Sequence, residues 1–154
     1  MQEAKNYAMR LLSGRAYTKK TLCEKITARF DEESAEAAVT RMEELGLIND
    51  ADYARRYAAD CLNLKRYSLR RTAQALHQKG IDRHIIEDTL AEMEFAPEQS
   101  VARLLERKYP KWQEDEKNKT RAVNALVRLG YGYGDIRTVM QNLQEDPEYY
   151  EEVE

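Results

Sequence analysis

The sequence predicts an all-α protein, built as an elongated tandem array of three three-helix repeat modules. Residues 17–20 (Tyr-Thr-Lys-Lys) align with residues 67–70 (Tyr-Ser-Leu-Arg), and Leu76 aligns with both Ile26 and Leu126, at an offset of 50 positions. Charged residues make up 34% of the chain, and only six glycines and three prolines interrupt it, which is typical of helical proteins. A period of this length indicates stacked helical units, each of which buries its apolar face against its neighbours.

The first module is predicted over residues 1–48 as three helices. Apolar side chains recur at helical spacing up to Gly14, where a left-handed cap should end the first helix. Thr18 and Asp31 belong to the residue types that cap helix N-termini, so the second and third helices are expected to begin there. Gly46 should end the third helix.

The second module is predicted over residues 49–95 on the same plan. Its three helices should begin at capping residues, namely Asn49 or Asp50, Ser68 and Asp82. Gly80 supplies the break between the second and third helices. The equivalent turn of the first module has no glycine.

The third module is predicted over residues 96–144. Pro97 suits the first turn of a helix, and the stretch 109–119 is expected to be an irregular loop that Trp112 holds in place. Two further helices should follow, the last of them ending near Leu143.

An acidic tail is predicted over residues 145–154. It holds six acids and no base, whereas residues 1–144 hold all 25 bases and the other 22 acids. The body therefore carries a charge of about +3, and the tail is expected to be disordered. A tail of this kind could also fold back on a basic groove and mimic a polyanion.

The composition argues against a membrane protein, a metalloprotein and an enzyme. The chain has no run of eighteen apolar residues and no apolar N-terminal stretch of the signal-peptide kind, so we expect a soluble, cytoplasmic protein. Cys23 and Cys61 lack the spacing of a disulfide framework or zinc site, and His77 and His84 have no ligand partners nearby. The glycines of residues 130–134 lack the lysine of a phosphate loop. We therefore expect no catalytic residue, no cofactor and no metal.

Basic residues recur near the start of the second helix of each module, and they are most closely spaced around Tyr67. Basic groups beside an aromatic ring suit phosphates and bases, or an acidic protein groove, although charged outer faces are also ordinary on helices. The residues predicted to bind a nucleic acid or an acidic protein partner are Lys19, Lys20, Arg55, Arg56, Lys65, Arg66, Arg70, Arg71, Lys119 and Arg121.

Residues 45–54 (Leu-Gly-Leu-Ile-Asn-Asp-Ala-Asp-Tyr-Ala) resemble the "LGLIDDxxYA" segment of the RecX family, regulators of bacterial recombination. Residues 67–71 followed by 78–82 agree with the family as well, as do residues 7–12 followed by 17–18. The resemblance covers roughly residues 4–143. Three features depart from it, namely the missing glycine between Arg29 and Phe30, Thr72 in place of an aliphatic residue, and a degraded third module.

The resemblance implies a non-enzymatic regulator of homologous recombination. Such a protein binds the RecA filament on single-stranded DNA, limits filament growth, and inhibits RecA ATPase and strand exchange. The implied partners are the RecA filament and single-stranded DNA, the latter contacted weakly or through the filament, and a monomer would suffice. Lys20, Arg70, Arg71 and Arg121 are expected to contribute most, in a salt-sensitive manner.

Two other functions fit the residues. The chain could be a helix-turn-helix-like duplex DNA-binding protein whose helix from Ser68 to Lys79 enters a major groove, although a body charge of about +3 weighs against tight duplex binding. Alternatively it could be a helical protein-interaction scaffold that uses some of its ten tyrosines.

Overall fold

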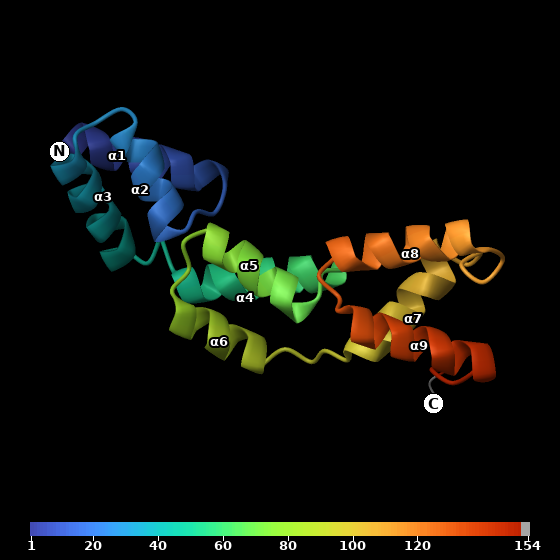
Figure 1. Cartoon of the computed structure of the whole chain (residues 1–154). Helices are drawn as coiled ribbons and strands as arrows, with labels where there is room; N and C mark the ends of the chain where they lie inside the picture. The colour runs from blue at the N-terminus through green and yellow to red at the C-terminus, as the bar shows by residue number, and fades with distance from the viewer. Residues whose placement is uncertain (152–154) are drawn as a thin grey trace. The chain divides into compact units, whose positions relative to one another are not determined.

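The computed structural model describes residues 1–151, and over these residues it contains nine α-helices and no strand (Figure 1). The prediction of an all-α chain is confirmed. The helices are α1 (Gln2–Gly14), α2 (Lys19–Thr27), α3 (Glu32–Glu44), α4 (Asp50–Asn63), α5 (Leu69–Gln78), α6 (Arg83–Ala91), α7 (Pro97–Lys108), α8 (Glu116–Arg128) and α9 (Tyr133–Glu145).

The chain folds as two compact units. Unit 1 comprises Met1–Cys61 and Ala73–Glu92, and unit 2 comprises Leu62–Thr72 and the chain from Met93 onward. The division falls within α4 and α5: most of each helix belongs to unit 1, and their adjoining ends, with the loop between them, belong to unit 2. The module boundaries after residues 48, 95 and 144 stay a prediction.

Side-chain caps start four of the five helices for which the sequence predicts one. In each case the side-chain oxygen accepts a hydrogen bond, 2.7 to 3.2 Å long, from the backbone N–H three residues further on, and the residues are Thr18, Asp31, Asn49 and Ser68. Asp82 stands at the start of α6, but its side chain makes no capping hydrogen bond. These local hydrogen bonds satisfy backbone donors that the first turn of a helix leaves unpaired.

Two predicted boundaries were wrong. Gly14 lies in the last turn of α1 and has no positive φ, because the chain leaves this helix through Arg15 in an extended conformation. The predicted loop over residues 109–119 is shorter, since α8 already begins at Glu116. Asp115 causes the early start, because its carboxylate accepts a 2.7 Å hydrogen bond from the N–H of Asn118.

The core of unit 1 forms where α1, α2 and α3 pack together (Figure 1). Its large, fully buried side chains are Leu22, Ile26 and Met42, and the small residues Ala4, Ala8, Ala35 and Ala38 let the helices approach closely. The apolar stripes predicted from helical spacing therefore face this core.

The core of unit 2 is formed by α7, α8, α9 and the turn that holds Trp112. The predicted acidic tail begins inside this unit, because Glu145 is the last residue of α9 and turns follow it up to Tyr150. The Tyr150 hydroxyl accepts a 2.8 Å hydrogen bond from Asn142 and donates one of 3.1 Å to Glu98 on α7. Residues 152–154 of the predicted tail lie outside the described residues.

Candidate interaction surface

The N-terminus of α2 contacts the glycine turn between α5 and α6. The Thr18 hydroxyl donates a 2.6 Å hydrogen bond to the carbonyl of Lys79. The next residue, Gly80, has φ +85° and lies against the side-chain stem of Lys20, where a Cβ atom would have no room. The capping residue of one helix thus also fixes a turn about 60 positions away in the sequence.

A corresponding contact lies in unit 2, 50 positions further along the chain, although its donor is a backbone N–H and not a side-chain hydroxyl. There the backbone N–H of Ser68 donates a 2.9 Å hydrogen bond to the carbonyl of Leu129. Gly130 has φ +101° and packs against the side chains of Ser68 and Arg71. We call each contact between a capping residue and a glycine turn a cap–glycine junction. The sequence repeat therefore encodes a repeated tertiary contact.

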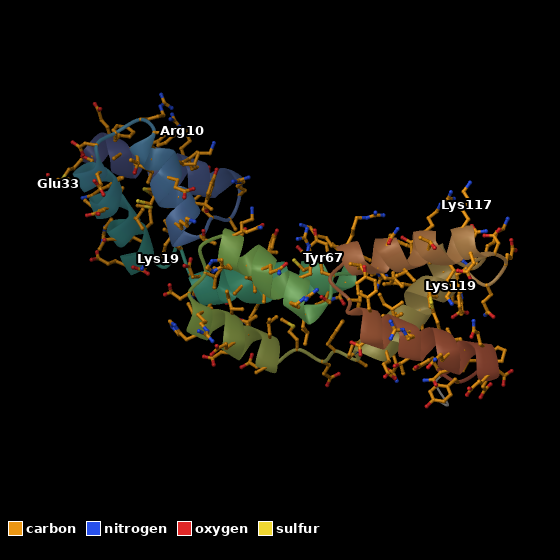
Figure 2. All side chains as sticks on the ribbon, in the orientation of Figure 1. Arg10, Lys19, Glu33, Tyr67, Lys117 and Lys119 are labelled. Carbon is orange, nitrogen blue, oxygen red and sulfur yellow. The ribbon has the colours of Figure 1, made fainter. Side chains whose placement is uncertain are left out.

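The predicted basic residues of α2 lie at the first junction and are partly neutralised. The Lys19 ammonium forms a 3.1 Å ion pair with Glu43, and this hydrogen bond is the main cause of its raised pKa. The backbone N–H of Lys19 donates to Asp50, a carboxyl whose pKa is raised chiefly by burial. Lys20 has a looser pair, at 4.0 Å, with Glu24. Figure 2 shows Lys19 near the end of α3.

The predicted basic residues of the second junction surround Tyr67, which Figure 2 labels. The Lys65 ammonium lies 5.6 Å from the centroid of this ring, and the Arg71 guanidinium carbon lies 5.0 Å from it. Both distances are those of cation–π contacts. Arg71 is half-buried and its Nε has no hydrogen-bond partner, whereas Arg70 is exposed and reaches the Gly130 carbonyl at 3.4 Å.

The other predicted residues lie on α4 and α8. Arg55 pairs with Asp52, and Arg56 lines a cavity of about 420 Å³ in unit 1 together with Tyr17, Tyr53 and Tyr57. Tyr53 and Tyr57 are half-buried, and their stacked rings have centroids 5.7 Å apart.

Lys119 and Arg121 both lie on α8, from which Lys119 and its neighbour Lys117 extend in Figure 2. Lys119 lines a cavity of about 360 Å³ between α8 and α9, and Arg121 is exposed. Of the ten predicted residues, unit 1 holds Lys19, Lys20, Arg55 and Arg56, and unit 2 holds the other six. Within unit 2, Lys65, Arg66, Arg70 and Arg71 are neighbours in one loop and the helix that follows it.

A set of basic residues on α7 was not predicted from the sequence. Arg103, Arg107 and Lys108 line a cavity of about 70 Å³ together with Arg66, Ser100 and Leu104. We call this cavity the basic pocket. The spacing of four residues between Arg103 and Arg107 was a usable signal, because it places both on one face of a helix. The contact with the loop of Arg66 is long-range, and the sequence pattern gave no sign of it.

Tyr131 connects α7 to the loop of Arg66. Its hydroxyl lies 2.6 Å from the Ser100 hydroxyl and makes a longer contact, 3.4 Å, with the carbonyl of Arg66. The side chain is 2% exposed, and this burial is the main cause of the raised pKa of Tyr131. The ring thereby fixes one wall of the basic pocket relative to the other.

Replacing Tyr131 with phenylalanine is expected to lower the free energy of unfolding by about 1 kcal/mol, because the Ser100 hydroxyl loses its partner while the ring stays buried. Urea titration followed by the fluorescence of Trp112, the single tryptophan of the chain, measures the change in unit 2. Tyr133→Phe is the matched control, since Tyr133 is 60% exposed and should give no measurable change. Equal stabilities of the two variants would show that the Tyr131 hydroxyl contributes nothing.

The described residues offer neither a metal site nor a membrane span. Within residues 1–151, no three His, Cys, Asp or Glu side chains are grouped closely enough to hold a metal ion. In the same part of the chain, no helix has the length and apolar character needed to cross a bilayer.

Comparison with known proteins identifies the family. The model of the first three-helix domain of RecX matches residues 4–42, and the model of the second matches residues 49–90. "Regulatory protein RecX" of Thermus thermophilus is 34% identical over 148 residues, which cover 96% of this chain and 97% of that protein. The protein of the same name from Streptomyces coelicolor is 31% identical, over 96% of this chain and 81% of that protein.

A solved structure has the same fold. The crystal structure of RecX from Lactobacillus salivarius superimposes with a TM-score of 0.76 at 24% identity, over 94% of this chain and 96% of that one. The chain therefore belongs to the RecX family, a family of regulatory proteins that are not enzymes.

Proposed function

We propose that this protein binds the RecA filament on single-stranded DNA and limits filament growth, which lowers the ATPase and strand-exchange activities of RecA. The observation that carries the proposal is membership of the RecX family along nearly the whole chain. The partner on this proposal is the recombinase filament, reached in the cytoplasm, with single-stranded DNA contacted weakly or through the filament.

The two cap–glycine junctions support the proposal physically. Each presents cations near the start of a second helix, as Lys20 does in unit 1 and Arg70 in unit 2. Repeated contacts of this kind can each be weak and still hold a polymer of repeated subunits, because every contact after the first is intramolecular. Cations that face a polyanion also make binding sensitive to salt.

The single-stranded-DNA-dependent ATPase of a bacterial RecA, titrated with this protein at moderate salt, tests the proposal. Inhibition is expected well below one molecule per RecA protomer, because capping filament growth acts on many protomers at once. Stimulation, or no effect at any ratio, would overturn the proposal.

Charge reversal at Arg70 and Arg121 tests the assigned surface. Both side chains are exposed, whereas the half-buried Arg71 would confound binding with folding. Arg70→Glu with Arg121→Glu is expected to raise the concentration that gives half-inhibition about tenfold at low salt, and less at high salt. The matched control reverses Arg83 and Arg128, which are exposed on α6 and α8. If both double variants inhibit equally, net charge governs binding and Arg70 and Arg121 have no special role.

A further inference from the structure

The basic pocket of unit 2 is lined by cations from two separate elements. Arg66 comes from the loop between α4 and α5, and the other charged residues come from the exposed face of α7. The lining contains four cations and no carboxylate, and its members are Arg66, Ser100, Arg103, Leu104, Arg107 and Lys108. A concentration of like charge costs free energy unless an anion offsets it. The pocket therefore has the charge distribution of an anion site.

The spacing along α7 brings these side chains to one face. Leu104 follows Ser100 by four residues, and Arg107 and Lys108 follow Leu104 by three and four, so these side chains lie on one side of the helix. Leu104 is 5% exposed and anchors this face to the core, while the charged residues are exposed. The helix thus holds this face by a buried leucine and presents its charged groups to solvent.

Arg66 is held in a conformation that arginine rarely adopts. Its φ is +61°, and within residues 1–151 it is the one non-glycine residue in the left-handed region. The surrounding contacts impose this conformation, since the Tyr131 hydroxyl contacts the Arg66 carbonyl and the Ser68 N–H is bound to Leu129. Backbone strain of this kind persists where the structure around it over-determines the residue, and it concentrates at functional sites. Here it places Arg66 on the pocket wall opposite α7.

We propose that the basic pocket binds a backbone phosphate of single-stranded DNA. Guanidinium groups donate paired hydrogen bonds to phosphate oxygens, and the Lys108 ammonium adds a point charge. A volume of about 70 Å³ accommodates one small oxyanion or a few waters, and not a base.

Single-stranded DNA fits the pocket better than an acidic protein segment or a duplex. A nucleic-acid strand brings successive phosphates that Arg107 and Lys108 can reach at the end of α7, and each phosphate offers oxygens for paired guanidinium hydrogen bonds. A flexible strand can direct a phosphate into a recess. A rigid duplex needs a broad basic face, and a body charge of about +3 does not supply one.

The acidic C-terminal segment lies beside this pocket. Arg103 and Arg107 also line a neighbouring cavity of about 370 Å³, to which Glu106 and Glu151 contribute. These carboxylates lower the positive potential that an approaching phosphate meets. Glu151→Gln is therefore expected to tighten binding of single-stranded DNA.

Fluorescence anisotropy of a labelled oligothymidylate, measured with the full-length protein and without recombinase, tests the pocket directly. Arg66→Asn removes the charge and keeps a residue that tolerates positive φ, so the loop should stay folded. Arg66→Asn and Arg107→Gln are each expected to weaken binding about tenfold at low salt and to reduce the salt dependence by about one ion. Arg128→Gln, an exposed arginine of α8, is the matched control and should bind as the wild type does.

Three outcomes would overturn the proposal. The first is that wild-type protein fails to bind the oligothymidylate at low salt, and the second is that both pocket variants bind as well as Arg128→Gln. The third is that polyglutamate displaces the DNA as effectively as unlabelled oligothymidylate does, which would make the site one for acidic protein. Because no recombinase is present, none of these outcomes bears on inhibition of RecA, so the two proposals fail independently.

Discussion

Replacing Gly130 with alanine is expected to lower the free energy of unfolding of unit 2 by about 3 kcal/mol. Two costs add at this position. The backbone has φ +101°, where a Cβ atom is strained, and the new Cβ would overlap the side chains of Ser68 and Arg71. The neighbouring Arg71 backbone nitrogen, 3.3 Å from the new atom, leaves little freedom to relax. Gly80→Ala should cost a similar amount in unit 1, because Lys20 approaches Gly80 at its own Cβ.

Two other glycines allow the cost of backbone strain to be measured apart from the cost of steric overlap. Gly46 has φ +73° but open space around its Cβ position, so Gly46→Ala should cost only the strain, about 1 kcal/mol. Gly134 lies in the first turn of α9 with neither positive φ nor a close neighbour, and Gly134→Ala should be neutral or stabilise by up to about 0.5 kcal/mol.

Urea titrations measure this series, with Trp112 fluorescence for unit 2 and far-UV circular dichroism for the whole chain. The expected order of destabilisation is Gly130 and Gly80 first, then Gly46, then Gly134. If Gly130→Ala cost no more than Gly46→Ala, close packing at the junction would contribute nothing to stability, and the repeated contact would be incidental.

The glycine turns were predictable because their chemistry is local. At the ends of α5 and α8 the N–H of the residue after glycine bonds the carbonyl five residues earlier, as Ile81 bonds Leu76 at 3.2 Å and Tyr131 bonds Leu126 at 3.1 Å. This is the Schellman pattern, which favours glycine and an apolar contact between those same residues. The sequence shows both features as a repeat, so the turns could be located without a structure.

What the glycine turns pack against was not predictable. Gly80 lies against Lys20 and Gly130 against Ser68, at separations of about 60 residues, and no local pattern encodes such contacts. The turn after α2, which is the equivalent turn of the first module, does not need a glycine. Its backbone hydrogen bonds, from Arg29 and Phe30 to Ile26, close on α2 itself and leave φ negative. At Gly80 and Gly130, unlike at Gly46, residues from the start of another helix approach the turn closely.

The candidate site was predicted only in part, because the sequence shows local clusters of residues but not long-range packing. Arg66 and Arg71 were selected because bases cluster around Tyr67 in the sequence, and the cation–π contact of Arg71 agrees with that clustering. The sequence could not show that Lys19 is paired with Glu43, nor that Arg66 faces Arg107 across a cavity. Both facts depend on how helices from distant parts of the chain pack.

Replacing Leu126 with alanine is expected to destabilise unit 2 by about 3 to 4 kcal/mol, the largest effect of any substitution considered. Leu126 is fully buried in the core of this unit, and truncating a buried leucine loses both its transfer free energy and the packing around the cavity it leaves. The same residue stands at the end of α8, where its carbonyl accepts the hydrogen bond from Tyr131.

The position of Leu126 links core packing to the basic pocket. If alanine loosens the last turn of α8, the contact of Tyr131 with Ser100 and Arg66 weakens too, so loss of stability and loss of oligothymidylate binding should occur together. Leu64→Ala is the matched control, because Leu64 is 75% exposed and its truncation should change stability by less than about 0.5 kcal/mol. Urea titration by Trp112 fluorescence measures the first effect and anisotropy the second. Intact DNA binding by a destabilised but folded Leu126→Ala protein would show that the pocket wall does not depend on this turn.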